Sequence, residues 1–489
     1  MVSPSLTSDD SVAAKIFIEG TWRDALDGRQ ASSTDPATGL VIGRFADGGH
    51  AETELAIAAA RHAFFKTTWS RDPRRRAAAL LAMADRLDAA REELARLLTA
   101  ENGKLLSDSL MEITNAASMC RYNAGLARNL FGRVSEVEPG LMAMLPREAI
   151  GVAGVIVPWN APIGLLFRSI APALAAGCTV VIKPAPQTAL VTARAIDIVV
   201  SAGALPPGVL NLILETGSEG ARTLVASPDV DVISYTGSTA IGKRIMADGA
   251  KTLKRLNLEL GGITPSIVLQ DADLDRVVPT LVKAGMIFAG QQCVAVSRVL
   301  VHRARADEVT ARLAESLGKI IVGPGSEPVT EMGPLIDVAN RDRVLTLVKD
   351  AAREHEVVLA GAIPETRPAG SAFLTPSLIR IRDRESALTR DEIFGPVLTI
   401  DRFEDADEAV ALANDTRLGL AVSVWNSDLR LAQKMAQSLR FGTVWINQHG
   451  RFHHEVEIGG YKESGLGRLN GQTGIDDFLQ TKHIGWSLS

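Results

Sequence analysis

The sequence predicts an α/β protein built on a parallel sheet, and three observations support this. Between residues 151 and 262, short β-branched segments alternate with stretches long enough for helices. Strict alternation favours parallel strands with helices on both faces. Polar and glycine-rich segments directly follow these strands, where ligands of such sheets bind. The chain of 489 residues also exceeds what one hydrophobic core normally supports, so at least two domains are expected.

The expected elements follow in chain order. Leucine spacing predicts one helix from Pro73 to Gly103, and Pro139-Gly140 predicts the turn of a hairpin within 137–145. Helices are expected after Pro162 and over 188–200. Five strands are expected, at 151–157, 178–182, 209–214, 230–236 and 255–260.

Composition excludes several classes of function. A net charge of −5 and a pI of about 6.0 give no basic field for nucleic acid or for a membrane surface. No secretory signal is visible, and no apolar run reaches the ~18 residues of a spanning helix. Cys120, Cys178 and Cys293 are too few and too scattered for a disulfide framework or a metal cluster. A reducing, cytoplasmic location and no metal are therefore expected.

Polar segments end three of the expected strands. Asn160 follows a rigid corner in VPWN, and its amide either donates to an oxyanion or bonds its own backbone. Lys183 in VIKPAP either reaches a ribose hydroxyl or phosphate, or lies in solvent. Gly237 and Ser238 in YTGSTAIG open a helix whose amides suit a phosphate, although the spacing is not GxGxxG. None of these segments identifies a function alone.

A carboxylate and a cysteine carry stronger chemistry. Alternation in LELGG places Glu259 opposite the leucines, where it is either solvated or a general base whose pKa is tuned by burial. Cys293 in FAGQQCVAVSR is either an inert core residue or a nucleophile. Gly290, Gln291 and Gln292 form a polar approach that favours the nucleophile, with backbone amides close by.

Together, these segments resemble the aldehyde dehydrogenase superfamily over nearly the whole chain. The spacing from Glu259 to Cys293 matches that between the family's base and nucleophile. Any one motif is weak, whereas seven in the family's order are highly specific. They are PWN, KPAPQT, YTGSTAIG, LELGG, GQQC, EIFGPV (392–397) and GGYKESGLGR (459–468).

The resemblance implies a hydrolytic, NAD(P)+-dependent mechanism. Cys293 attacks the aldehyde carbon, and the Asn160 amide and the Cys293 backbone N–H hold the oxyanion. The tetrahedral carbon then gives up hydride to the nicotinamide more readily than a planar carbonyl carbon would. Glu259 activates the water that hydrolyses the thioester, so an aldehyde becomes a carboxylic acid.

The resemblance also implies a cofactor site, domains and an assembly. A Rossmann-type NAD(P)-binding domain would span 1–130 and 150–262, and an α/β catalytic domain 263–462. Small β oligomerisation strands, 131–149 and 477–489, would make a homodimer or homotetramer. The residues implied to bind the cofactor are Val157, Trp159, Lys183, Gly217, Gly237, Ser238, Leu260, Glu392 and Phe394.

Three residues depart from the family pattern. Pro186 replaces a glutamate that holds the adenosine ribose in many NAD-preferring members. It adds no partner for a 2′-phosphate, so NAD+ is favoured and NADP+ stays open. Leu469 replaces a glutamate proposed to relay the proton from Glu259. Glu215 stands where a first loop glycine is common, but Gly217 is kept and only a local change is expected.

Substrate contacts are assigned from the same resemblance. Ala161 and Ile287 stand where broad-range members often carry aromatics, which predicts a wide mouth for a bulky, aromatic or carboxylate-bearing aldehyde. Arg168 is either a carboxylate clamp, as in semialdehyde-oxidising members, or a structural arginine paired with an acid. The predicted pocket comprises Ala161, Leu165, Arg168, Ile287, Gln292, Val294, Phe452 and His453, with His454 close behind.

Other functions remain open at this point. A semialdehyde dehydrogenase with Arg168 as clamp is the main alternative. A CoA-acylating enzyme is disfavoured because such members typically lack the carboxylate that Glu259 supplies. A non-catalytic member is disfavoured because Asn160, Glu259 and Cys293 are all present. Esterase activity is expected as a side reaction of the thiolate and its oxyanion site.

Overall fold

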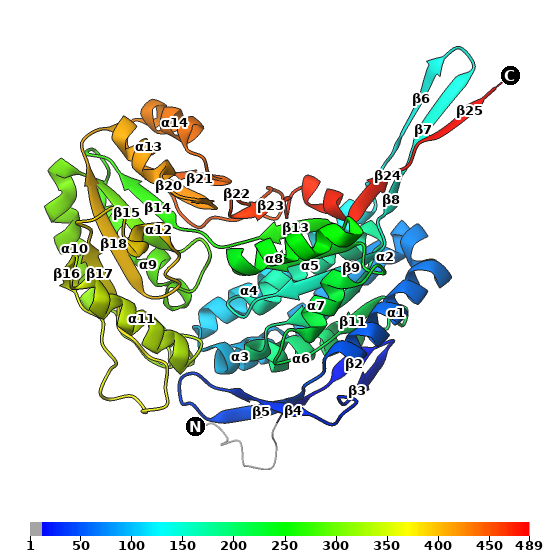
Figure 1. Cartoon of the computed structure of the whole chain (residues 1–489), viewed down its shortest axis with the longest axis horizontal. Coiled ribbons are helices and arrows are strands. Elements are labelled where there is room, and N and C mark those ends of the chain that lie inside the picture. Colours follow the sequence, from blue (N-terminus) through cyan, green and yellow to red (C-terminus); the bar gives the residue numbers. More distant parts are fainter. Residues whose placement is uncertain (1–11, 489) are drawn as a thin grey trace.

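The computed structural model describes residues 12–488 and places them in two lobes with a projecting arm (Figure 1). An eight-stranded sheet forms the centre of the first lobe and a seven-stranded sheet that of the second. Each lobe has its own hydrophobic core. Within the described residues, no helix is long and apolar enough to cross a membrane.

The sheet of the first lobe contains the five expected strands, which run parallel to one another. Its order is β23-β13-β12-β9-β10-β11-β2-β3. The outer strands, β23 (Gly465–Leu466), β2 (Ile16–Ile18) and β3 (Thr21–Arg23), are antiparallel additions. The expected strands have bounds close to those predicted: β9 (Val152–Val157), β10 (Thr179–Pro184), β11 (Leu210–Leu212), β12 (Val232–Thr236) and β13 (Arg255–Glu259).

The strand order explains why the polar segments converge. From β9 the chain passes to β10 and β11 through α5 (Pro162–Ala176) and α6 (Ala189–Val200). It then returns to the other side of β9 through α7 (Glu219–Ala226), and α8 (Thr239–Gly249) joins β12 to β13. Successive strands are thus added on one side of β9 up to β11 and on its other side from β12 onward. The residues that follow β9 and β12 therefore flank a topological switch point, where such sheets bind ligands.

Helices from the first part of the chain complete the lobe. Alongside α7 lies α1 (His50–Lys66), whereas α4 (Leu106–Ala127) packs on α5. The helix predicted from Pro73 to Gly103 is two helices, α2 (Pro73–Ala89) and α3 (Arg91–Asn102), separated at Ala90. The break turns α3 toward residues 186–188 and α6. Gly103, with a φ of 86°, ends α3 as predicted.

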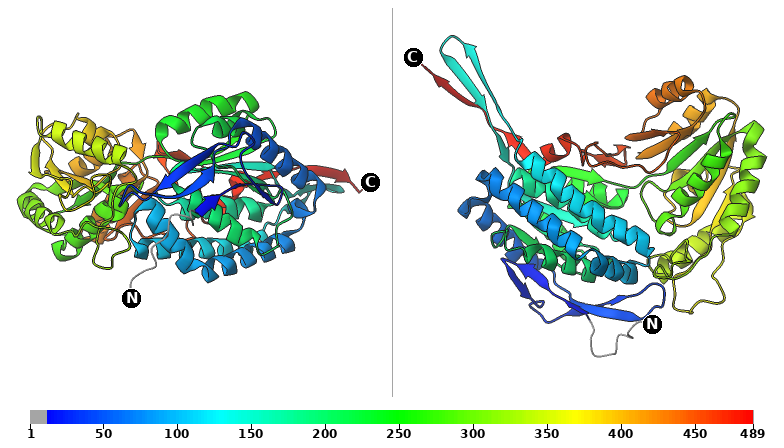
Figure 2. Two further views of the ribbon diagram at one scale, coloured as in Figure 1. Left: turned by 90° about the horizontal axis from the view of Figure 1, so that it is seen from below. Right: turned by 180° about the vertical axis from the view of Figure 1, so that it is seen from behind.

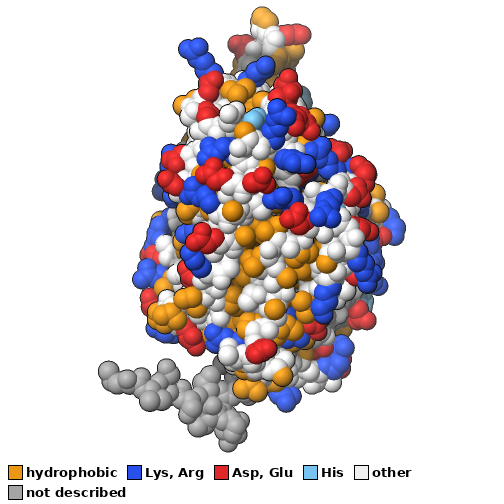
Figure 3. All heavy atoms as spheres, turned by 90° about the vertical axis from the view of Figure 1, so that its left-hand side faces the viewer, with side chains coloured by type: hydrophobic (Ala, Val, Ile, Leu, Met, Phe, Trp, Pro, Cys, Tyr) orange, Lys and Arg blue, Asp and Glu red, His pale blue; other side chains and the backbone are white. Residues whose placement is uncertain are grey.

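The second lobe carries the loop of the cysteine. Its sheet is parallel except for β16 (Glu356–Leu359), and its order is β16-β17-β18-β15-β14-β20-β21. Figure 3 shows the outer face of this lobe, where interspersed basic and acidic side chains surround an apolar centre. The parallel strands are β14 (Thr264–Val268), β15 (Val296–His302), β17 (Ser377–Arg380), β18 (Val397–Phe403), β20 (Ala421–Trp425) and β21 (Thr443–Ile446).

Helices flank this second sheet. The first, α9 (Leu274–Met286), leads directly into the cysteine loop, and α10 (Ala306–Gly318) packs against it. Next comes α11 (Val338–Ala351), which lies between β15 and β16 in the chain. The last two, α13 (Ala406–Asn414) and α14 (Leu429–Ser438), pack on each other beside β20.

The predicted hairpin forms the arm that projects from the first lobe (Figure 2). It starts earlier than expected, with β6 (Arg133–Glu138) and β7 (Leu141–Leu145) joined at Gly140, whose φ is 80°. The C-terminal strand β25 (Ile484–Ser487) pairs with the other edge of β7. The hairpin of residues 133–145 and the C-terminal strand therefore lie side by side in this arm.

Candidate active site

The loop that carries Cys293 has an unusual backbone. It follows η4 (Ile287–Gly290), a short kinked segment in which Phe288, Ala289 and Gly290 have left-handed backbone, with φ of 51°, 55° and 75°. At Gly290, a Cβ atom would lie 2.1 Å from the carbonyl oxygen of Gly395. Only glycine fits this approach, so the loop is locked against the EIFGPV segment.

Gln291 anchors the loop rather than opening it. The sequence predicted a polar, open approach, but Gln291 is buried. Its Oε1 accepts hydrogen bonds from the Ile336 N–H and from Nδ2 of Asn340, both at 3.0 Å. Its Nε2 donates to the Phe288 carbonyl at 2.9 Å. Glutamine is needed here because it supplies an acceptor and a donor at once.

Asn160 reaches across from the other lobe to this loop. It follows β9 and directly precedes the start of α5. Its Nδ2 donates to the Gln291 carbonyl at 3.0 Å, two residues before Cys293. One N–H of the amide is thereby fixed, and the amide carries a second N–H. A turn residue bonded to its own backbone, the simpler interpretation of the sequence, is not what the structure contains.

Cys293 differs from the other two cysteines. Cys120 and Cys178 are buried in the core of the first lobe, whereas Cys293 is partly exposed. Burial raises the pKa of the Cys293 thiol to about 11; Arg168 opposes this rise, while Glu392 and Glu259 add to it. The resting thiol is therefore protonated at neutral pH, and its proton must pass to a base before it can attack.

Glu259 has the environment of a general base. It ends β13, lies opposite Thr236 of β12 and is buried, so the solvated alternative is excluded. Its Oε1 has no hydrogen-bond partner among the described residues. Burial raises its pKa to about 7, against the effect of Arg168 and Arg468. A carboxyl with a pKa near the working pH exchanges protons efficiently.

Arg168 lies close enough to Glu259 and Cys293 to act on both electrostatically. It is buried on α5, and its Nη2 donates to Oγ1 of Thr236 at 3.1 Å. Its charge lowers the pKa of both Glu259 and Cys293. No carboxylate forms a salt bridge with it among the described residues, and its Nε is buried without a partner. The structural ion pair considered from the sequence is therefore absent.

Three predicted cofactor residues also come together near Cys293. The rings of Trp159 and Phe394 meet edge to face with centroids 5.5 Å apart. Glu392 accepts a hydrogen bond from the Gly262 N–H at 3.2 Å, and burial raises its pKa to about 7. At Gly261, a Cβ atom would lie 2.5 Å from the Glu392 carboxylate. The glycine pair after Glu259 thus makes room for this second carboxylate.

The remaining cofactor candidates lie along the carboxyl ends of the sheet. Val157 ends β9, and Gly237 and Ser238 lie between β12 and α8. Leu260 packs against Gly242 of α8, where a Cβ atom would lie 2.5 Å from its side chain. Beside Gly217 there is open space before α7.

Glu215, expected to cause only a local change, contacts the predicted cofactor lysine. It is buried and lies 3.6 Å from Nζ of Lys183. Its two carboxylate oxygens accept hydrogen bonds from the N–H groups of Gly220 and Ala221, at 2.8 and 3.1 Å. The solvated alternative for Lys183 is excluded, because its side chain is also buried.

A second aromatic ring, Trp445, lies beside the predicted pocket residues Val294 and Phe452, and the sequence did not indicate it. Val294 forms a small cluster with Leu420, Ala421 and Trp445, against which Cys293 packs. The Trp445 ring lies tilted against His449, with centroids 4.7 Å apart, and meets Phe452 edge to face at 5.4 Å. Phe452 therefore adjoins this cluster through Trp445, with 43% of it exposed, and its place in a substrate pocket stays a prediction.

The histidine that contacts this cluster is not one that the sequence predicted. His449, not a predicted residue, donates from Nε2 to the Val294 carbonyl at 3.0 Å, and burial lowers its pKa to about 4. It is neutral in ordinary conditions. Burial also lowers the pKa of His454, and His453 is exposed on the loop. Burial therefore disfavours the charged form of His454. The other predicted pocket residues, Ala161, Leu165, Ile287 and Gln292, are partly exposed on the α5 and Cys293 segments.

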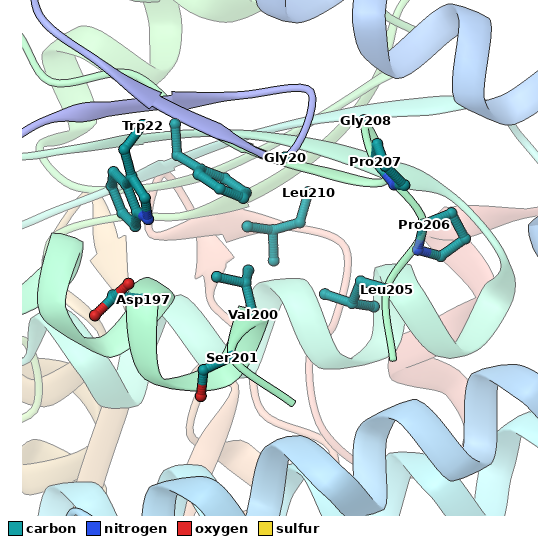
Figure 4. A pocket seen from close by; sticks show the side chains of 11 residues that line it. Gly20, Trp22, Asp197, Val200, Ser201, Leu205, Pro206, Pro207, Gly208 and Leu210 are labelled. Carbon is teal, nitrogen blue, oxygen red and sulfur yellow. The ribbon is translucent and has the colours of Figure 1, made fainter. Parts of the chain in front are cut away.

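Two hollows elsewhere lack these groups. One of about 290 Å³ lies between β2, β3 and the end of α6 and is lined by Trp22, Asp197 and Val200 (Figure 4). It lies at the β2–β3 side of the sheet, opposite the side that bears Glu259. The other lies at the base of the arm. Among the described residues, no group of three His, Cys, Asp or Glu side chains could hold a metal ion.

The fold and this site define an α/β enzyme with a cysteine, a carboxylate and an amide at the edge of a nucleotide-binding type of sheet. A family model described as the aldehyde dehydrogenase family matches residues 22–484. The chain belongs to this family and is an NAD(P)-dependent oxidoreductase, which confirms the resemblance and the fold class expected from the motifs.

Named relatives span several aldehydes. A mitochondrial succinate-semialdehyde dehydrogenase of Arabidopsis thaliana is 37% identical, over 99% of this chain and 91% of its own. A betaine aldehyde dehydrogenase of Bacillus subtilis is 37% identical, over 96% of both chains. The crystal structure of a Staphylococcus aureus betaine aldehyde dehydrogenase in complex with NAD+ matches with a TM-score of 0.95 and 35% identity, over 97% of this chain and 94% of that one.

Proposed function

We propose that the chain oxidises an aldehyde to the carboxylic acid with NAD+, using Cys293 as nucleophile, Asn160 as oxyanion donor and Glu259 as base. The observation that carries the proposal is the meeting of the two lobes, where the Asn160 amide bonds the backbone two residues before Cys293. Glu259 acts on the same thiol electrostatically. The reaction class itself follows from the family.

The residues divide the chemistry between them. The thiol proton passes to a neighbouring carboxylate and from there to solvent, so the carboxylate can act again, and Arg168 stabilises the thiolate that remains. Sulfur attacks the aldehyde carbon, and the free Asn160 N–H holds the oxygen as it becomes negative. Bound NAD+ supplies the hydride acceptor. Glu259 then takes a proton from water, whose oxygen attacks the thioester carbon and releases the Cys293 thiol and the acid.

The cofactor residues of the chain fit NAD+. Trp159, Phe394 and Glu392 would hold the nicotinamide end near Cys293, and open backbone beside Gly217 would admit the adenosine end. The Staphylococcus aureus relative was crystallised with NAD+. We propose NAD+ rather than NADP+, because Glu215 already engages the cation and the helix amides that a 2′-phosphate would seek.

The pocket favours a bulky or aromatic aldehyde. Trp445 and Phe452 present ring surface beside Val294, and the small Ala161 leaves the mouth wide. Carboxylated aldehydes are the second candidate, because Arg168 has a buried, unpartnered Nε beside the reacting groups. The succinate-semialdehyde relative supports this candidate. CoA-dependent acyl transfer is disfavoured because a buried base suited to hydrolysis is in place.

One experiment tests the proposed function. Aliphatic, aromatic and carboxylated aldehydes are assayed with both cofactors through the absorbance of reduced nicotinamide, for the wild type and Arg168→Ala. Acid formation with NAD+ is expected, fastest with bulky aldehydes. If Arg168→Ala lowers kcat/KM for carboxylated and neutral aldehydes equally, the clamp is wrong. If no aldehyde yields reduced nicotinamide, the proposed function is wrong.

We also propose that the arm joins copies of the chain in a homodimer or homotetramer. Its sheet exposes apolar side chains, among them Val134, Val137 and Trp486. A hollow of about 1120 Å³ at its base is lined by Phe65, Phe131 and several arginines. Exposed apolar surface of this kind marks protein contacts. A cytoplasmic location remains a prediction from the cysteine content.

A further inference from the structure

A buried lysine that no sequence motif singled out lies behind the site. The side chain of Lys104 is fully buried. Its Nζ donates to the carbonyl oxygen of Asn160 at 2.7 Å and to Oε2 of Glu112 at 2.6 Å. It also lies 4.0 Å from the ring centroid of Phe288 in the cysteine loop. An ion pair this deep adds little net stability, because removing both charges from water is costly.

Glu112 extends the contact to the helix that follows Asn160. Its other oxygen, Oε1, accepts hydrogen bonds from the N–H groups of Ile163 and Gly164, at 2.8 and 3.0 Å. These belong to the first turn of α5, whose orphan amides need acceptors. The ion pair therefore fixes both the Asn160 carbonyl and the start of α5.

Lys104 also lies where the two lobes meet. The N–H of Leu106 donates to the Gly325 carbonyl of the second lobe at 2.9 Å. At Gly325, a Cβ atom would lie 2.1 Å from the Lys104 carbonyl oxygen, so the backbones touch directly. The cation thus bonds Asn160 on one side and contacts Phe288 on the other, and these are the two segments that must be aligned at Cys293.

We propose that Lys104 and Glu112 are positioning residues for the oxyanion site. By holding the Asn160 carbonyl they set the direction of its side-chain amide, and the Phe288 contact holds the cysteine loop against it. Donors to an oxyanion act fully only when they are fixed before the reaction. The inference rests on the proposed role of Asn160.

The main test variant removes both charges together, because a single substitution at Lys104 or Glu112 leaves the other charge buried alone. K104M/E112Q removes both charges and keeps an oxygen for the α5 amides. Glu112→Gln alone is the milder companion. Lys254→Met is the matched control. Lys254 lies directly before β13, is also buried, and donates hydrogen bonds to the carbonyl oxygens of Ser227 and Val230, both at 2.6 Å.

Two readouts separate positioning from general stability. The rate of the first reduced-nicotinamide turnover should fall on the order of 10²-fold in K104M/E112Q, as for loss of an oxyanion donor. Glu112→Gln should show a smaller loss. NAD+ affinity, measured by calorimetry, should stay unchanged in both, and Lys254→Met should keep the wild-type rate. Adding Asn160→Ala to K104M/E112Q should cost little more, since both changes disable one donor.

The opposite results are equally clear. Full first-turnover rates in both K104M/E112Q and Glu112→Gln would overturn the inference. The inference is also wrong if the rate losses from Asn160→Ala and from K104M/E112Q multiply when the substitutions are combined, since Lys104 would then not act through Asn160. If the double variant does not fold, an unslowed Glu112→Gln alone overturns it. A wild type without aldehyde-dependent activity would instead refute the proposed function.

Discussion

In the proposed reaction Cys293 loses a proton and Glu259 accepts one, and burial raises the pKa of both groups. The thiol must lose a proton although its pKa is raised to about 11, whereas the carboxyl must be free to accept one with a pKa of about 7. Arg168 lowers both values and lies against Thr236, the strand partner of Glu259. A single buried cation therefore favours the charged form of each reacting group.

A pH dependence follows for the hydrolytic step. Glu259 is protonated below its pKa of about 7 and cannot accept a proton from water there. Acid release should therefore rise with pH and reach half its maximum near pH 7, in single-turnover measurements. Arg168→Met should move this midpoint to higher pH, because the charge that lowers the Glu259 pKa is lost. An unchanged midpoint in that variant would show that the rise reports another group.

At the scale of elements, the carboxylate of Glu215 already binds the first amides of α7. Glu215 accepts the amides of Gly220 and Ala221 and lies beside Lys183. A helix N-terminus and a lysine are together attractive to a phosphate. We therefore expect the Glu215 carboxylate to disfavour a 2′-phosphate here, which would compensate for the neutral Pro186.

Replacing that carboxylate should relax cofactor choice. Glu215→Gln keeps an oxygen for the α7 amides but removes the charge. The ratio of kcat/KM for NADP+ to that for NAD+ should rise on the order of tenfold, about 1.4 kcal/mol. Glu219→Gln, an exposed acid on the same helix, is the control and should leave the ratio near the wild-type value. A ratio that responds equally in both variants would contradict a role for the Lys183 contact.

At the scale of the whole molecule, the two lobes share one site and the arm stands apart from it. Asn160 and Gln291 connect the lobes, and β25 joins the C-terminal segment to the hairpin. Contacts through the arm should therefore change assembly more than chemistry.

An arm variant checks this separation. Val137→Asp with Trp486→Asp places charge on exposed apolar positions of β6 and β25. Light scattering should show a smaller species than the wild type, because burying those charges between copies is costly. Wild-type mass in the variant, or a wild type that is already monomeric, would rule out assembly through the arm.

The sequence predicted what alternation and motif order encode. It predicted the five parallel strands and the hairpin turn at Gly140, while the chemistry assigned to Asn160, Glu259 and Cys293 stays a prediction. Contacts between segments that are distant in the sequence could not be predicted. Lys104, Gln291 and His449 act through backbone carbonyls or amides of remote residues, and no local pattern marks such partners. The break at Ala90 was also missed, since leucine spacing continues across it.

The central claim is that Cys293 carries the acyl group. In Glu259→Gln, hydrolysis should stall after hydride transfer, so mixing enzyme, aldehyde and NAD+ should give one equivalent of reduced nicotinamide. Mass spectrometry of the quenched protein should then find the acyl mass on the peptide that contains Cys293. Reduced nicotinamide formed without an adduct on that peptide, or with the adduct on Cys120 or Cys178, would contradict the account.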